Sequence, residues 1–167
     1  NVKTNSDSIK NSSPSQSDLD NLLNYYQSKQ YNLAEKSASI LTEKFPNHPF
    51  AWSVLGALFN QTGKFKNALI AFQKSITIEP NKSEAHNNLA NTLLKLDRLE
   101  EAEESCRKAI FLDSKNELAY NNLGQILFEL KKFDESESAF RSAISLRQNF
   151  VQAYFNLGNT LKTMGKL

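Results

Sequence analysis

The sequence predicts an all-α solenoid, a stack of antiparallel helix pairs. Two observations predict it: an internal repeat with a period of 34 residues, and two apolar stripes at helical spacing inside each repeat. A short polar break at residues 62–64 separates the two stripes in the best-formed repeat and indicates a tight turn between two helices. The stripes of that repeat are Trp52, Leu55 and Phe59, then Ala68, Phe72 and Ile76.

The repeat keeps its register along most of the chain. The equivalent positions are Trp52, His86, Tyr120 and Tyr154; Leu55, Leu89, Leu123 and Leu157; Gly56, Ala90, Gly124 and Gly158; Phe72, Cys106 and Phe140. Small residues at one position and bulky residues at another predict close approach of the two helices of a pair. Pro46 and Pro80 end two repeats, whereas Ser114 and Gln148 stand at that position in the later ones, so softer helix ends are expected there.

The pattern Trp-x-x-Leu-Gly-x-x-Phe, followed by Ala-x-x-x-Phe-x-x-Ser and Pro, resembles the tetratricopeptide repeat (TPR). The resemblance implies a right-handed superhelical solenoid of about four repeats plus an unpaired last helix. The expected segments are a flexible leader at 1–16, a divergent first repeat acting as a cap at 17–48, repeats at 49–82, 83–116 and 117–150, and the first helix of a truncated repeat at 151–167.

Composition excludes several classes of protein. Lys and Arg exceed Asp and Glu by only 20 to 18, which argues against a nucleic-acid binder, and no apolar run approaches the length of a membrane span. One cysteine, Cys106, rules out an internal disulfide and fits either a reducing compartment or indifference to redox state; a cytoplasmic location is expected. Cys106 falls on a core position, where a thiol behaves as a small hydrophobe.

No catalytic, metal or cofactor site is predicted. His48 lies in a junction and is expected on the surface, whereas His86 takes an aromatic packing position. The glycines never form a phosphate-binding loop. We therefore expect a protein that is not an enzyme and needs no cofactor.

Carboxamides gather on the first helix of each repeat, which lines the concave face in a TPR fold. Because asparagine is a mediocre helix former, its repeated use there favours binding of a peptide backbone, for which a carboxamide offers both donor and acceptor. Asn88, Asn122 and Asn156 resemble the asparagine ladder of the TPR region of O-linked N-acetylglucosamine transferases, although Val54 breaks it in the earlier repeat. The predicted peptide-binding residues are Asn87, Asn88, Asn91, Asn121, Asn122, Gln125, Asn156 and Asn159.

Two further groove features follow from the pattern. The carboxylate clamp of chaperone-binding TPRs needs a basic residue on this face, and Ser53, Asn87, Asn121 and Phe155 stand there instead. Leu94, Phe128 and Leu118 either form pockets for partner side chains or pack against neighbouring helices.

The expected function is a non-catalytic interaction scaffold that binds an extended peptide or a partner helix in its concave groove. The alternative is the recognition arm of a larger glycosyltransferase, sulfotransferase or methyltransferase. Because the chain stops within a repeat, we also expect an exposed last helix that allows self-association through Tyr154, Leu157 and Leu161. Neither nucleic acid nor membrane is an expected partner.

Overall fold

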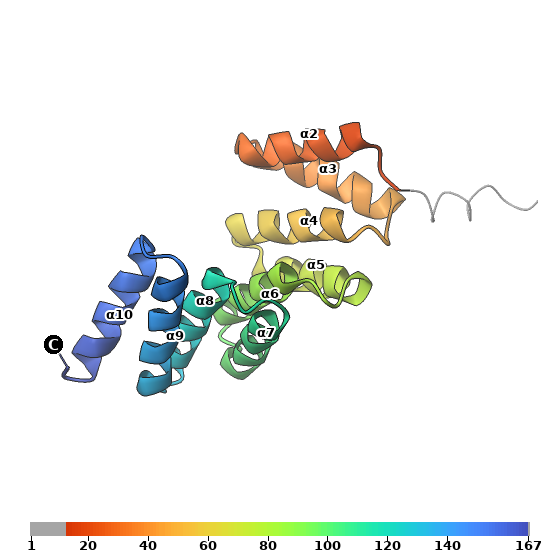
Figure 1. Cartoon of the computed structure of the whole chain (residues 1–167). Coiled ribbons are helices and arrows are strands. Elements are labelled where there is room, and N and C mark those ends of the chain that lie inside the picture. Colours follow the sequence, from red (N-terminus) through yellow and green to blue (C-terminus); the bar gives the residue numbers. More distant parts are fainter. Residues whose placement is uncertain (1–12, 167) are drawn as a thin grey trace, which may run out of the picture. The chain divides into compact units, whose positions relative to one another are not determined.

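The computed structural model describes residues 13–166 and is all-α over that range, which confirms the predicted fold class. The predicted leader lies mostly outside the described residues. The helices are α2 (Gln16–Gln27), α3 (Tyr31–Lys44), α4 (Pro49–Gln61), α5 (Phe65–Ile78), α6 (Ser83–Lys95), α7 (Leu99–Leu112), α8 (Glu117–Glu129), α9 (Phe133–Leu146) and α10 (Val151–Thr163) (Figure 1).

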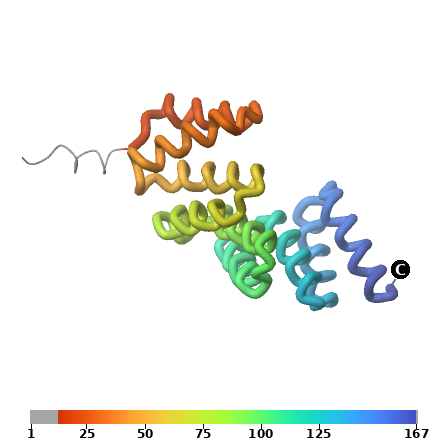
Figure 2. The backbone as a smooth tube through the Cα atoms, turned by 180° about the vertical axis from the view of Figure 1, so that it is seen from behind, coloured from red at the N-terminus to blue at the C-terminus, as the bar shows by residue number. Residues whose placement is uncertain are grey.

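The chain divides into two compact units, residues 1–80 and 81–167. The first contains α2 to α5, and the second contains α6 to α10. Consecutive helices inside each unit contact one another, and α8 also contacts both α6 and α10. In the second unit, α8, α9 and α10 lie side by side in both Figure 1 and Figure 2. Each unit is thus a stack of antiparallel helix pairs.

The turn that follows each first helix, α10 included, has one geometry throughout. Its central residue has a positive φ of 58–72° and recurs every 34 residues. The next residue donates its amide to a carbonyl five residues back, as Lys64 does to Phe59 and Lys132 does to Leu127. These are the hydrogen bonds of a Schellman motif. The left-handed residues are Lys29, Gly63, Asp97, Lys131 and Gly165.

The ends of the second helices do not depend on proline. α5, α7 and α9 stop at equivalent residues, although Pro80 follows only the first of them. The residue after each helix has a φ between −131° and −145° with a positive ψ, which ends the helix, and its amide still bonds back to the last turn. The expected softer ends after α7 and α9 are therefore wrong in this respect, because backbone geometry stops all three helices alike.

Within a pair, a small residue on the first helix receives a ring from the second. A Cβ added to Gly56 would lie 2.8 Å from Phe72 Cε1, and one added to Gly124 would lie 2.6 Å from Phe140 Cε1. At the equivalent place in the repeat between them, Ala90 and Cys106 are both fully buried. The predicted close approach of small and bulky positions is thus present, and Cys106 lies in the core.

The first helix pair begins one residue earlier than the sequence suggested. Ser15 caps α2 by accepting a hydrogen bond from the Asp18 amide at 3.2 Å, so the helix starts at Gln16. Leu22 of this pair is fully buried, and it belongs to one core with residues of α3 and α4. The divergent repeat therefore packs in the same manner as the others.

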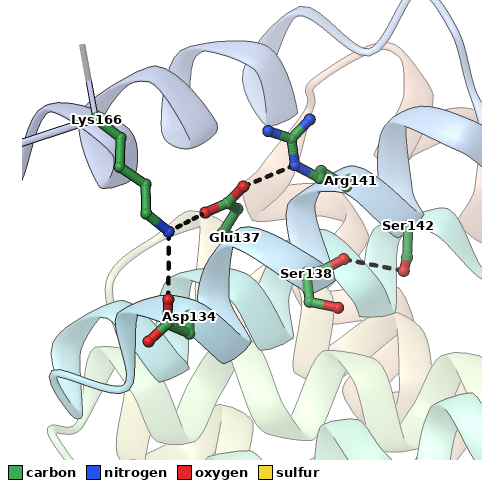
Figure 3. A network of polar contacts seen from close by, with 6 residues as sticks. All are labelled: Asp134, Glu137, Ser138, Arg141, Ser142 and Lys166. Atoms are coloured by element: carbon green, nitrogen blue, oxygen red, sulfur yellow. Dashed lines mark hydrogen bonds and ion pairs between the residues drawn. The ribbon is translucent and has the colours of Figure 1, made fainter. Parts of the chain in front are cut away.

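The last helix is fixed to α9 by an ionic network. Lys166 Nζ donates to Glu137 Oε2 at 3.0 Å and to Asp134 Oδ1 at 3.3 Å, and Arg141 also binds Glu137 (Figure 3). Tyr154 is 51% exposed, as expected for the outer face. Leu157 is only 8% exposed, so its predicted exposure is wrong. It is buried like its equivalent Leu123 because α10 already contacts α8 and α9.

Other large apolar side chains of α10 are also exposed. Val151 and Phe155 are 79% and 64% exposed, and a Cβ on Gly158 would meet nothing within 4 Å. Leu161 is half-buried. The expected self-association through this face stays a prediction.

Candidate groove for peptide binding

All eight predicted binding residues lie in the second unit, on its first-of-pair helices. Three come from α6, three from α8 and two from α10. Because α8 contacts both of the other helices, these residues form one continuous wall. We call the wall made by α6, α8 and α10 the groove wall.

Two pairs of these asparagines bind each other across the helices. Asn122 Nδ2 donates to Asn87 Oδ1 at 2.9 Å, and Asn156 Nδ2 donates to Asn121 Oδ1 at 3.2 Å. Both acceptors, Asn87 and Asn121, are 6% exposed. Burial of a carboxamide is costly unless it is hydrogen-bonded, so these pairs link neighbouring repeats. The structure therefore places Asn87 and Asn121 inside the helix contact and not on an open wall.

The three predicted ladder residues differ in which of their side-chain polar atoms remain free to bind a ligand. The Asn156 Oδ1 atom accepts from Gln152 Nε2 at 3.0 Å, so both polar atoms of Asn156 are engaged. Asn122 keeps its Oδ1 for an external donor. Asn88 makes no side-chain hydrogen bond within residues 13–166.

A second set of carboxamides is unpaired. Asn91, Gln125 and Asn159 occupy equivalent positions 34 residues apart, one each on α6, α8 and α10. Over the described part of the chain, their side chains have no hydrogen-bond partner, and each is at least partly exposed. We call these three residues the open amide row. They supply unsatisfied donors and acceptors to a ligand.

A cavity of about 630 Å³ lies on the groove wall around α8. Gln125 and Asn159 of the open amide row line it, together with Asn156. Its volume falls within the range of about 300–1,000 Å³ that is typical of ligand sites. We call it the α8 cavity.

One part of the α8 cavity is apolar. Leu94 and Phe128 stand at equivalent positions of α6 and α8, one turn beyond the open amide row, and Phe140 lies deeper. Phe128 also contacts Phe133, with ring centroids 5.4 Å apart. Leu94 and Phe128 were the predicted groove-edge residues, and both line the cavity. Leu118 does not line it and is 46% exposed.

Charges of both signs border the cavity. Lys95 and Asp97 approach from the end of α6, Glu129 from α8 and Lys162 from α10. None of the four forms an ion pair within residues 13–166. Sequence reasoning missed these residues together with Leu99, Thr160 and Thr163. The shared repeat position of Leu94, Phe128 and Lys162 could have indicated part of this set.

Two ionisable groups outside the α8 cavity have pKa values shifted by burial. Burial raises the pKa of the Cys106 thiol to about 12, so the thiol stays protonated at neutral pH. Burial lowers the pKa of His48, which is half-buried beside Phe50 and not a free surface residue as expected. Among the described residues, no cluster of His, Cys, Asp or Glu has the arrangement of a metal site.

The described helices are too short or too polar to cross a bilayer. Across residues 13–166, no helix combines the length and apolar character that a membrane span requires.

Several solved structures have a similar fold. The chain is 20% identical to the protein in "Crystal structure of MamA protein", with a TM-score of 0.78 over 89% of this chain and 81% of that one. It is 16% identical to "MamA 41-end from Desulfovibrio magneticus RS-1", with a TM-score of 0.80 over 89% and 84% of the two chains. "First TPR of Spaghetti (RPAP3) bound to HSP90 peptide SRMEEVD" gives 21% identity and a TM-score of 0.68 over 70% of this chain and 93% of that one.

These likenesses establish the fold and not a shared ligand. A search of curated proteins found no match. Models of the tetratricopeptide repeat match residues 19–83, 83–116 and 118–150, which together are most of the chain. The chain belongs to the tetratricopeptide repeat family.

Proposed function

We propose that this protein is a non-catalytic interaction scaffold that binds a peptide segment of a protein partner along the groove wall. The observation that carries the proposal is the α8 cavity, where unpaired carboxamides border an apolar recess. The lining of the cavity is mixed: polar and charged side chains surround a smaller apolar recess made by Leu94, Leu99, Phe128 and Phe140.

The family supports this proposal at a coarse level. TPR proteins are generally interaction scaffolds, and one structural neighbour, the first TPR of Spaghetti (RPAP3), is bound to an HSP90 peptide. That peptide ends in an acidic sequence. At two of the positions where a carboxylate clamp would need a basic residue, α6 and α8 carry the buried carboxamides of Asn87 and Asn121, so we propose a different class of peptide.

The test is selection of peptides on the whole chain. A random heptapeptide display library is panned on the immobilised protein, and enriched sequences are synthesised and titrated by calorimetry. We expect binders whose addition shifts the NMR signals of Gln125 and Asn159. Replacement of Gln125 by alanine should weaken them.

A matched control uses the other unit. Gln73 is exposed on α5, so Gln73→Ala removes a carboxamide from a helix surface outside the groove wall. It should leave affinity unchanged. No enrichment above uncoated wells, or binders equally weakened by both variants, would overturn the proposal.

A further inference from the structure

We propose that the groove wall selects an extended segment with a large apolar side chain at its centre, and that the open amide row binds its backbone while the α8 cavity takes the side chain. This inference rests on the proposed function and specifies the partner. It assigns the backbone contacts to Asn91, Gln125 and Asn159 in place of the asparagine ladder.

The paired asparagines are poorly suited to the role. The Asn122 and Asn156 amides each already give one of their two N–H donors to a buried acceptor on the neighbouring helix, so neither carboxamide can turn toward a ligand without losing that bond. A buried acceptor left unpaired costs its full desolvation penalty, which offsets the new bond. The open amide row carries no such penalty because, within the described residues, its carboxamides have no partner to lose.

The row also has a spacing that an extended chain can follow. Packed helices lie about 8–10 Å apart, and an extended chain advances about 3.3 Å per residue. In the polyproline II form of an extended chain, with three residues per turn and about 3.1 Å per residue, every third peptide group faces the same side and can meet one carboxamide on each of α6, α8 and α10. Each carboxamide can donate to a carbonyl and accept from an amide, whatever the side chains between them.

The apolar recess lies next to this track. Leu94 and Phe128 follow Asn91 and Gln125 by three residues, which puts them on the same side of each helix one turn along. A side chain that points from the backbone toward this recess would be enclosed by Leu94, Phe128 and the buried Phe140. The cavity volume of about 630 Å³ admits a ring as large as that of phenylalanine or tryptophan together with neighbouring backbone.

A helical partner fits the wall less well. Inside a helix, the backbone amides and carbonyls are already bonded to each other. Such a partner would cover the open amide row and leave three carboxamides desolvated without partners, a cost that an extended segment avoids. The row therefore favours an extended occupant over a partner helix.

The bordering charges argue against recognition by net charge. Two cations, Lys95 and Lys162, are matched by two anions, Asp97 and Glu129. A segment centred here meets no dominant sign, so affinity should change little between low and physiological salt.

The experiment compares two capped heptapeptides, Ser-Gly-Ser-Phe-Ser-Gly-Ser and the same sequence with alanine at its centre, titrated into the ¹⁵N-labelled whole chain. We expect the phenylalanine peptide to shift the side-chain amides of Gln125 and Asn159 and to bind about tenfold more tightly than the alanine peptide. Transferred NOEs should show an extended backbone.

Three variants distinguish the backbone contact made by Gln125 from the apolar contact made by Phe128. Gln125→Ala should weaken both peptides by a similar factor, whereas Phe128→Ala should remove the preference for phenylalanine. Phe128→Leu keeps apolar volume and should retain much of the preference, which guards against misfolding of the alanine variant. Gln73→Ala on α5 is the control and should behave as the parent.

The outcomes are distinguishable. Equal affinity for the two peptides would overturn the apolar anchor while leaving the scaffold function intact. A selected binder that is helical when bound, or that leaves Gln125 and Asn159 unshifted, would overturn the extended occupant. Failure of both these peptides and the display library would overturn the proposed function itself.

Discussion

The side-chain amide of Asn122 on α8 donates to Oδ1 of Asn87 on α6 at 2.9 Å, joining two repeats through a buried acceptor. The bond recurs one repeat later between Asn156 and Asn121. Donor and acceptor are 35 residues apart, one more than the repeat period. In the repeat of α8 the two asparagines therefore divide their roles: Asn121 accepts from the following repeat, and Asn122 donates to the preceding one.

Removal of one member of this pair should destabilise the stack. Asn87→Ala leaves the Asn122 amide without its partner, and we expect a loss of about 1–2 kcal/mol in the free energy of unfolding. Urea denaturation of the single variants and of Asn87→Ala with Asn122→Ala measures it. The double variant should lose less than the sum of the singles, and additive losses would show that the bond contributes nothing.

Three glycines at equivalent positions provide an internal comparison. Gly124→Ala and Gly56→Ala should each cost about 1–3 kcal/mol, since the new methyl would overlap Phe140 or Phe72. Gly158→Ala meets nothing within 4 Å and gains helix propensity, so it should be neutral or stabilising by up to about 1 kcal/mol. Thermal unfolding of the three variants checks this order of stability. Comparable losses of stability at all three sites would contradict it.

Lys131 holds a left-handed conformation, with a φ of 60°, in the turn between α8 and α9. Lys131→Gly should stabilise the chain by about 1 kcal/mol, because glycine adopts this conformation without the Cβ penalty. The reverse change at the equivalent turn, Gly63→Ala, should destabilise by a similar amount. The midpoints of urea denaturation of both variants test this prediction. If Lys131→Gly is no more stable than the parent, the left-handed residue carries no strain.

Stability should fall on mild acidification through His48. Burial lowers the pKa of its imidazole below the ordinary value of 6.5, and its Nδ1 atom is buried without a hydrogen-bond partner among the described residues. The unfolded chain therefore binds the proton more readily, so this contribution to stability is complete above pH 6.5 and is lost as pH falls toward the lower folded-state pKa.

The measurement for His48 is the free energy of unfolding of the parent and of His48→Gln at several pH values between about 5 and 7.5. The difference between the two proteins should shift in favour of the variant as the pH is lowered. Parallel curves would show that the imidazole titrates alike in the folded and unfolded chains.

The repeat and the helix pairs can be predicted from the amino-acid sequence alone. The spacing of Trp52, Leu55 and Gly56 with Phe72 predicts two helices and their contact, because residues three and four apart share a helix face and small positions admit bulky ones. It also identified the face on which the carboxamides lie. These features depend on local periodicity, which a single chain displays directly.

Other features depended on contacts between repeats, which periodicity does not encode. The asparagines of the first helices look alike in the sequence, yet Asn87 is buried, Asn122 is its donor and Asn91 has no partner within the described part of the chain. The offset between donor and acceptor arises from how neighbouring helices pack side by side, as does the burial of Leu157 at the last helix. The α8 cavity likewise forms only where α6, α8 and α10 meet, so tertiary packing decided which carboxamides remain available to a ligand.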